Sequence, residues 1–99
     1  MTAMTSRAHQ RKRVLWDVML NQSGRIWRCS AFDISTGGIK IRIDEPLEIN
    51  SRVVIAIDRA GNFSGEVRWQ DRGLAGIVFL EDAAVVEQRL QRIPRAEEM

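Results

Sequence analysis

The feature that most restricts the fold of this chain is a series of short runs in which apolar and polar residues alternate. The clearest run is Ile39–Ile43, where Lys40 and Arg42 separate three isoleucines, the period-two pattern of a strand with one buried face. Turn signals separate runs of this kind roughly every ten residues, which favours a barrel or sandwich of short strands. Six strands are predicted: Val14–Leu20, Trp27–Phe32, Ile39–Ile43, Arg52–Ile57, Phe63–Trp69 and Leu74–Leu80.

The periodicity changes after the sixth run and predicts one helix. The apolar positions there are three or four residues apart: Ala83, Val86, Leu90 and Ile93. Asp82 is placed to cap the first turn, and Pro94 ends the run. The single apolar stripe predicts that this helix covers an open end of the barrel. The fold class is therefore all-β with a C-terminal helix, in which six short strands form a barrel or a sandwich.

Length and composition are those of one small domain. The chain has 99 residues, and 44% of them are hydrophobic. We expect a flexible basic N-terminal arm over residues 1–13, the barrel with its helix (about 82–93) over residues 14–93, and a tail over residues 94–99. No run of about 18 apolar residues is present, so membrane insertion is not expected. The single cysteine cannot form an internal disulfide, which favours the cytoplasm as the location.

Catalysis has little support in the sequence. His9 is the only histidine and lies in the basic arm, where a solvated role is favoured over that of a general base. Cys29 shares a strand phase with Trp27 and Ala31, which indicates a small buried side chain rather than a nucleophile. One cysteine and one histidine are too few for a zinc site, and no Gly-rich phosphate loop is present. We expect no enzyme activity, no metal and no cofactor.

Positive charge is concentrated at the N-terminus. The basic residues of the first thirteen, besides His9, are Arg7, Arg11, Lys12 and Arg13, and no acidic residue precedes Asp17. A basic arm on a nearly neutral body favours a local anion site over a long nucleic-acid track. A solvated, disordered leader is the alternative explanation of the same pattern.

The segment between the second and third strands is rich in polar residues and glycine. Asp33 offers a carboxylate acceptor, and Ser35 offers one donor and two acceptor lone pairs. Gly37 and Gly38 permit a positive φ and a close approach of the backbone to a ligand. An ordinary hairpin turn, in which Asp33 and Ser35 bond their own backbone, is the competing interpretation.

Arm and loop together resemble the two motifs of the PilZ domain family. The family pattern R-x-x-x-R fits Arg7 and Arg11, and the pattern [D/N]-x-S-x-x-G fits Asp33, Ser35 and Gly38. A strand bearing Trp69, followed by a strand that ends Gly76-Ile77-Val78-Phe79, matches the end of such domains. The resemblance covers about residues 7 to 93 and implies a six-stranded antiparallel barrel with a C-terminal helix.

The resemblance also implies a ligand, the second messenger cyclic di-GMP (c-di-GMP), which carries two phosphates and two guanines. Guanidinium groups can fork onto phosphate or onto the O6 and N7 edge of guanine, and a carboxylate can accept from guanine N1 and N2. The expected ligand-binding residues are Arg7, Arg11, Arg13, Asp33, Ser35 and Gly38. Arg13 is included because the second arginine of the motif usually stands just before the first strand; four residues before it is His9.

Three functions follow from these features. The first is a c-di-GMP receptor or adaptor that orders its basic arm on binding and signals to an unidentified partner protein in trans. The second is a degenerate PilZ-like interaction module that binds no nucleotide. The third, a nucleic-acid-binding barrel, would need an open face of aromatic rings. Trp16 and Trp69 stand on the apolar phase of their strands, which predicts that both belong to the core and that no nucleic acid polymer is bound.

Overall fold

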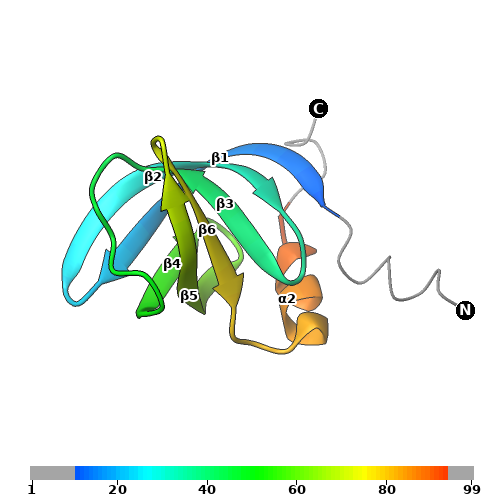
Figure 1. Ribbon diagram of the computed structural model, residues 1–99. Coiled ribbons are helices and arrows are strands. Elements are labelled where there is room, and N and C mark those ends of the chain that lie inside the picture. Colours follow the sequence, from blue (N-terminus) through cyan, green and yellow to red (C-terminus); the bar gives the residue numbers. More distant parts are fainter. Residues whose placement is uncertain (1–10, 94–99) are drawn as a thin grey trace, which may run out of the picture.

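The structure, a computed structural model, describes residues 11–93. The six predicted strands and the helix are present, in the predicted order: β1 (Lys12–Gln22), β2 (Arg25–Ile34), β3 (Gly38–Arg42), β4 (Arg52–Ile57), β5 (Gly61–Asp71), β6 (Leu74–Phe79) and α2 (Ala83–Leu90). The strands close into an antiparallel barrel in the order β1-β2-β3-β6-β5-β4 (Figure 1). The predicted fold class is confirmed.

Two tight hairpins each have a glycine at the second position of the turn, where a positive φ is required. Ser23 and Gly24 join β1 to β2 with φ angles of 54° and 85°, and Arg72 and Gly73 join β5 to β6 with φ angles of 50° and 80°. Two consecutive positive φ angles make the turn whose twist matches paired strands. In the first hairpin the Asn21 side chain also accepts a hydrogen bond from the Gly24 N–H at 3.1 Å. These turns set the register of both hairpins.

The barrel interior is filled by aliphatic side chains and two phenylalanines. The rings of Phe63 and Phe79 lie 5.1 Å apart in a tilted arrangement. The largest fully buried side chains are Phe63, Leu20, Ile34, Ile39, Ile41, Ile55, Val18, Val67 and Val86. Most of these stand on alternate strand positions, as the period-two pattern predicts, and side chains on the other phase face outward.

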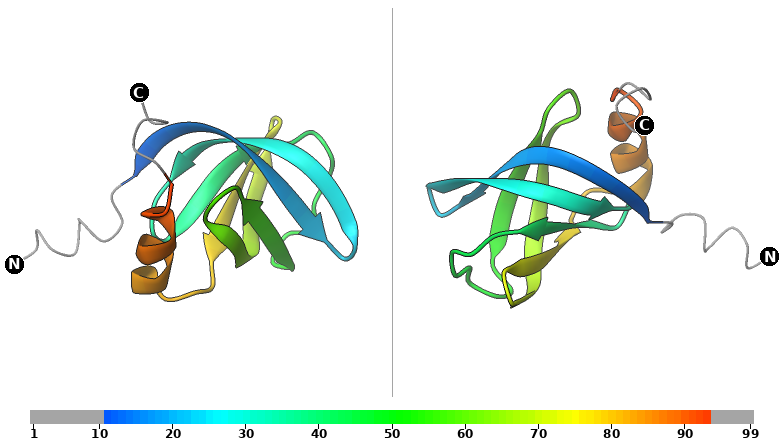
Figure 2. Two further views of the ribbon diagram at one scale, coloured as in Figure 1. Left: turned by 180° about the vertical axis from the view of Figure 1, so that it is seen from behind. Right: turned by 90° about the horizontal axis from the view of Figure 1, so that it is seen from above.

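The helix α2 lies against the end of the barrel where β5 begins and β6 ends (Figure 2). Val86 is its only fully buried residue, and Ile93 joins the same core after the helix has ended. Arg89 fastens the helix to the barrel by donating to the Asn62 carbonyl at 2.6 Å. Asp82 stands at the N-cap position, but its side chain makes no capping bond, so that expectation was wrong. The helix covers the barrel end as predicted, over a shorter range than 82–93.

Three of the strands carry a β-bulge, a feature that the alternation pattern did not predict. The register shifts lie between Arg13 and Trp16 in β1, between Ala31 and Asp33 in β2, and between Val67 and Trp69 in β5. In each case one extra residue stands opposite a shorter stretch of the partner strand. A bulge of this kind re-aims the side chains that follow it, and bulges often stand beside functional sites.

The predicted arm and the described chain overlap only in part. Lys12 and Arg13, which we assigned to the arm, belong to β1. The predicted flexibility of residues 1–10 lies outside the described residues, and so does the tail over residues 94–99.

Candidate ligand-binding site

Asp33 is brought to the barrel surface by the bulge in β2. Ala31 pairs with Ile41 and Asp33 pairs with Lys40, so Phe32 is the extra residue between them. On its other side Asp33 pairs with Arg13 of β1. Because the bulge interrupts the inward-outward alternation, the Asp33 side chain is partly exposed at the strand end rather than buried in the barrel.

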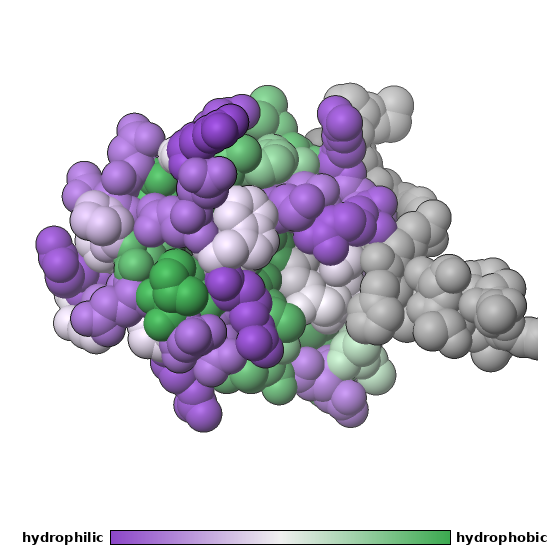
Figure 3. All heavy atoms as spheres, viewed as in Figure 1, coloured by the Kyte–Doolittle hydropathy of each residue, from purple (hydrophilic) through white to green (hydrophobic). Residues whose placement is uncertain are grey.

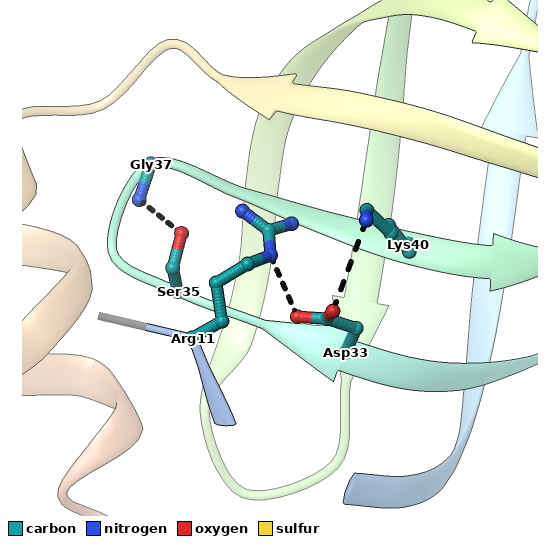
Figure 4. A network of polar contacts seen from close by, with 5 residues as sticks. All are labelled: Arg11, Asp33, Ser35, Gly37 and Lys40. Atoms are coloured by element: carbon teal, nitrogen blue, oxygen red, sulfur yellow. Dashed lines mark hydrogen bonds and ion pairs between the residues drawn. The ribbon is translucent and has the colours of Figure 1, made fainter. Parts of the chain in front are cut away.

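The Asp33 carboxylate contacts two cations, one just before β1 and one on β3 (Figure 4). Arg11 Nε lies 2.9 Å from Asp33 Oδ1, and Lys40 Nζ lies 3.9 Å from Oδ2. The side chains of Arg11 and Lys40 are 44% and 37% exposed, against 21% for Asp33. One residue of each predicted motif therefore meets the other in one corner of the surface, although 22 residues separate Arg11 from Asp33. Because the two cations remain open to solvent, this corner can accept an anionic ligand.

The structure describes one of the other two arginines that were predicted to bind the ligand. Arg13 lies opposite Asp33 in the β1–β2 register and is exposed, so it borders the same corner. Arg7 lies outside the described residues. The structure therefore brings Arg11 and Arg13 together with the loop and leaves the role of Arg7 as a prediction.

Ser35 organises the loop between β2 and β3. It is only 4% exposed, and its Oγ accepts a hydrogen bond from the Gly37 N–H at 3.1 Å. Its backbone N–H donates to the Gly38 carbonyl at 2.9 Å, and the Phe79 N–H donates to the Gly37 carbonyl at 2.9 Å. The hairpin-turn interpretation therefore applies to Ser35, which holds the shape of the loop.

Gly38 is required by the packing of β3 against β6. A Cβ atom at this position would lie 2.5 Å from the Ile77 carbonyl oxygen and 3.3 Å from the Val78 Cα. Among the described residues, the glycines with positive φ are Gly24, Gly61 and Gly73, so Gly37 and Gly38 do not use the positive φ that glycine permits. The close approach at Gly38 is between two strands of the barrel.

Trp69 belongs to the outer surface and not to the core, which corrects the prediction from its strand phase. Its side chain is among the exposed large hydrophobics, at 40% exposure. The bulge between Val67 and Trp69 causes this, because Arg68 is an extra residue and reverses the alternation. Trp16, in contrast, is partly buried and packs against the core.

The Trp69 ring lies over Gly76 of β6. A Cβ atom at Gly76 would stand 2.2 Å from the indole nitrogen, so only glycine leaves room for the ring. Gly76 pairs with Lys40, which in turn pairs with Asp33, so one row of partners crosses four strands from Asp33 to Trp69. Strands are spaced about 4.8 Å apart, which places the ring about 10 Å from Asp33. Over β3 and β6 the molecular surface mixes hydrophilic and apolar side chains (Figure 3).

Other chemistry is sparse in the described part of the chain. Cys29 is buried as predicted, and desolvation raises the pKa of its thiol to about 11. Between residues 11 and 93 no group of three or more side chains is suited to hold a metal ion. None of the helices in this range is long and apolar enough to cross a membrane.

The barrel is similar in fold to several solved structures. The PilZ domain of CeSA from a cellulose-synthesizing bacterium matches 80% of this chain and 92% of its own, with a TM-score of 0.70 and 18% identity. The PilZ domain of Escherichia coli YcgR with c-di-GMP matches 91% and 89%, with a TM-score of 0.68 and 18% identity. Borreliella burgdorferi PlzA in complex with c-di-GMP matches 88% of this chain and 42% of its own, with a TM-score of 0.62 and 17% identity.

These likenesses establish the fold. No curated protein matches the sequence. The sequence model of the PilZ domain matches residues 5–94, a range that includes the arginine motif, the Asp33–Gly38 loop and the Trp69 strand. The chain therefore belongs to the PilZ domain family.

Proposed function

We propose that this protein is a receptor for c-di-GMP. The observation that carries the proposal is the ion pair of Arg11 and Asp33 at the surface, because it brings one residue of each motif into one corner. The solved complexes of the YcgR PilZ domain and of PlzA with c-di-GMP support the same ligand for this chain. The roles of Arg7, Arg11, Arg13, Asp33, Ser35 and Gly38 in binding are part of the proposal.

In the proposed complex, the ligand separates Arg11 from Asp33. The guanidinium of Arg11 then binds a phosphate or the O6 and N7 edge of a guanine, and Asp33 accepts from guanine N1 and N2. An exposed ion pair contributes only about 0–1 kcal/mol, so opening it costs little. A hydrogen bond to a charged group is worth about 1.5–3 kcal/mol, so each new contact offsets that cost.

The remaining residues of the corner extend this binding mode. Arg13 assists at the barrel rim, and Lys40 adds a positive charge beside Asp33. The indole ring of Trp69 offers a flat surface on which a second guanine stacks, a contact worth about 1–3 kcal/mol. Ser35 and Gly38 act by holding the loop and the strands in position, since the Ser35 hydroxyl is buried and Gly38 faces β6.

The arm supplies the proposed switch. Arg7 stands four residues before Arg11, which is at most about 14 Å of extended chain, so it can reach the second half of the ligand. Ligand contacts must offset the conformational entropy lost when the arm becomes ordered. The ordered arm then presents a new surface to a partner protein in the cytoplasm. This sequence of events requires no catalytic step and no cofactor.

The proposal is tested by calorimetric titration of variants with c-di-GMP. Arg11→Ala and Asp33→Ala should each weaken binding about ten- to a hundredfold, and Arg7→Ala should weaken it less than Arg11→Ala. Asp71 and Arg72 are a matched control, because they form an exposed ion pair of 3.8 Å away from this corner. Asp71→Ala and Arg72→Ala should bind as the parent does.

Two results would contradict the proposal. Parental affinity in both Arg11→Ala and Asp33→Ala would show that the corner is not the ligand site. Absence of binding by the parent would leave the interaction module that binds no nucleotide. Amide relaxation of residues 1–10 with and without c-di-GMP tests the switch separately, and unchanged mobility would exclude ordering of the arm.

A further inference from the structure

The first half of β2 has a free edge. β2 has ten residues and β3 has five, and their pairing begins only at Ser30 and Arg42. On its other side, β2 pairs with β1 along almost its whole length, as far as Arg25 and Gln22. Within residues 11–93 no strand pairs with the β3-side edge of residues 25–29. The β1–β2 hairpin extends beyond the end of β3, away from α2 (Figures 1 and 2).

A groove runs beside this free edge. The chain leaves the sheet after β3 and is tied instead to the β5–β6 turn, where the Ile43 N–H donates to the Gly73 carbonyl at 2.9 Å. The space that opens has a volume of about 470 Å³, and its walls carry both a tryptophan ring and charged side chains. The residues that matter here are Trp27, Arg28, Arg42, Asp44, Glu45 and Arg72.

The guanidinium groups of this groove are available to a ligand. Arg28 and Arg42 are exposed, and neither forms an ion pair within the described residues, although Asp44 and Glu45 line the same groove. The Arg42 guanidinium does lie over the ring of Phe32, 5.6 Å from its centre. Among residues 11–93, Arg72 pairs with Asp71 alone, through side chains that are 89% and 73% exposed. Such an exposed pair is weak and is readily exchanged for another carboxylate.

The chemistry of the groove selects one kind of occupant. A free strand edge presents backbone N–H and C=O groups, which an extended peptide satisfies by pairing as an additional strand. Unpaired arginines favour acidic side chains on that peptide. A second copy of this edge is disfavoured, because it would bring Arg25 and Arg28 against the same two arginines.

We propose that the β2 edge binds an extended acidic segment of a partner protein, which adds to the barrel as a strand beside Trp27 and Arg28. This site lies at the opposite end of β2 from Asp33 and goes beyond the proposed c-di-GMP receptor function. The alternative role of these arginines is to prevent the exposed edge from pairing with other chains, as charged residues do on many edge strands.

The experiment is an NMR titration of the full chain with a synthetic capped peptide of alternating glutamate and valine. The expected result is a saturable shift of the Trp27 indole signal and of the amides of residues 26–28, with a dissociation constant below about 1 mM. Arg28→Glu and Arg72→Glu, both at exposed positions, should each weaken binding at least about tenfold by exchanging attraction for repulsion. Arg92→Glu, an exposed change after α2, should leave it unchanged.

Peptide controls separate strand addition from simple charge attraction. A peptide of alternating lysine and valine should not bind, and a glutamate–valine peptide with alternate N-methylated amides should lose binding because it cannot pair with the edge. No shift at about 1 mM peptide, equal binding of the lysine peptide, or equal binding by Arg28→Glu would each overturn the proposal. Asp33→Ala should bind the peptide normally, which distinguishes this site from the c-di-GMP site.

Discussion

Replacing Gly38 with alanine is expected to destabilise the barrel whether or not a ligand is bound. The added Cβ would lie 2.5 Å from the Ile77 carbonyl oxygen, where ordinary contact begins at 3.4 Å. Both neighbours are backbone atoms of β6, and five registered pairs hold the two strands together. The strands must therefore separate by roughly an ångström, an overpacking that costs about 1–3 kcal/mol.

Urea unfolding followed by circular dichroism measures this cost. For a domain of this size, each kcal/mol lowers the melting temperature by about 4–8 °C, so thermal unfolding gives a second measurement. Gly76→Ala is the matched control, because the three atoms nearest to its added Cβ all belong to the side chain of Trp69, which can rotate away. Unchanged unfolding of Gly38→Ala together with lost c-di-GMP binding would refute the reasoning and assign Gly38 to ligand contact.

Three further predictions concern the surface ring, the loop and the buried thiol. Gly76→Ala should displace the Trp69 ring into solvent and shift the tryptophan fluorescence to longer wavelength, and an unchanged spectrum would contradict the contact. Ser35→Ala should lower the free energy of unfolding by about 0.5–1.5 kcal/mol, because the Gly37 N–H loses its acceptor; denaturant unfolding with no change in midpoint would contradict this. Burial raises the pKa of Cys29 from 9.0 to about 11, so below pH 9 the thiol is protonated in both states and its effect is absent. Between pH 9 and 11 the Cys29 thiol ionises only in the unfolded chain, so the free energy of unfolding should fall by about 2–3 kcal/mol relative to Cys29→Val. Parallel pH profiles of the two proteins would contradict the shift.

The period-two alternation was sufficient to predict the strands, because most strand residues face the side of the sheet that the alternation assigns to them. Ile39 and Ile41 are buried and Lys40 between them is not, which is the pattern read from the sequence. The turns at Ser23-Gly24 and Arg72-Gly73 were predictable because each contains a glycine, the residue that a positive φ favours. These local signals agree with the tertiary structure, and the element boundaries differ from prediction by a few residues.

The bulges could not be predicted by the same reasoning. A bulge adds one residue and exchanges the two faces of the strand after it, and no single residue type marks where this occurs. The extra residue Arg68 turned Trp69 outward, although the alternation of Phe63, Gly65 and Val67 pointed to the core. Phe32 has the corresponding effect on Asp33.

The candidate site was predictable as a set of residues but not as a geometry. Motif spacing identified Arg11 and Asp33, and the structure brings them together as an ion pair of 2.9 Å. Their mutual pairing was not anticipated, because the sequence assigned them to different parts of one ligand. The structural roles of Ser35 and Gly38 depend on Gly37 and Ile77, a loop hydrogen bond and a strand contact that only the folded chain reveals.

A calorimetric titration of the full chain with c-di-GMP, near physiological salt, tests the central claim most directly. The account predicts saturable heat at micromolar ligand, or about −8 kcal/mol of binding free energy. GMP and GTP, which cannot contact both the Arg11–Asp33 corner and the Trp69 ring with two guanines, should bind much more weakly. No heat with c-di-GMP, or equal affinity for GMP, would contradict the assignment of this corner as a receptor site.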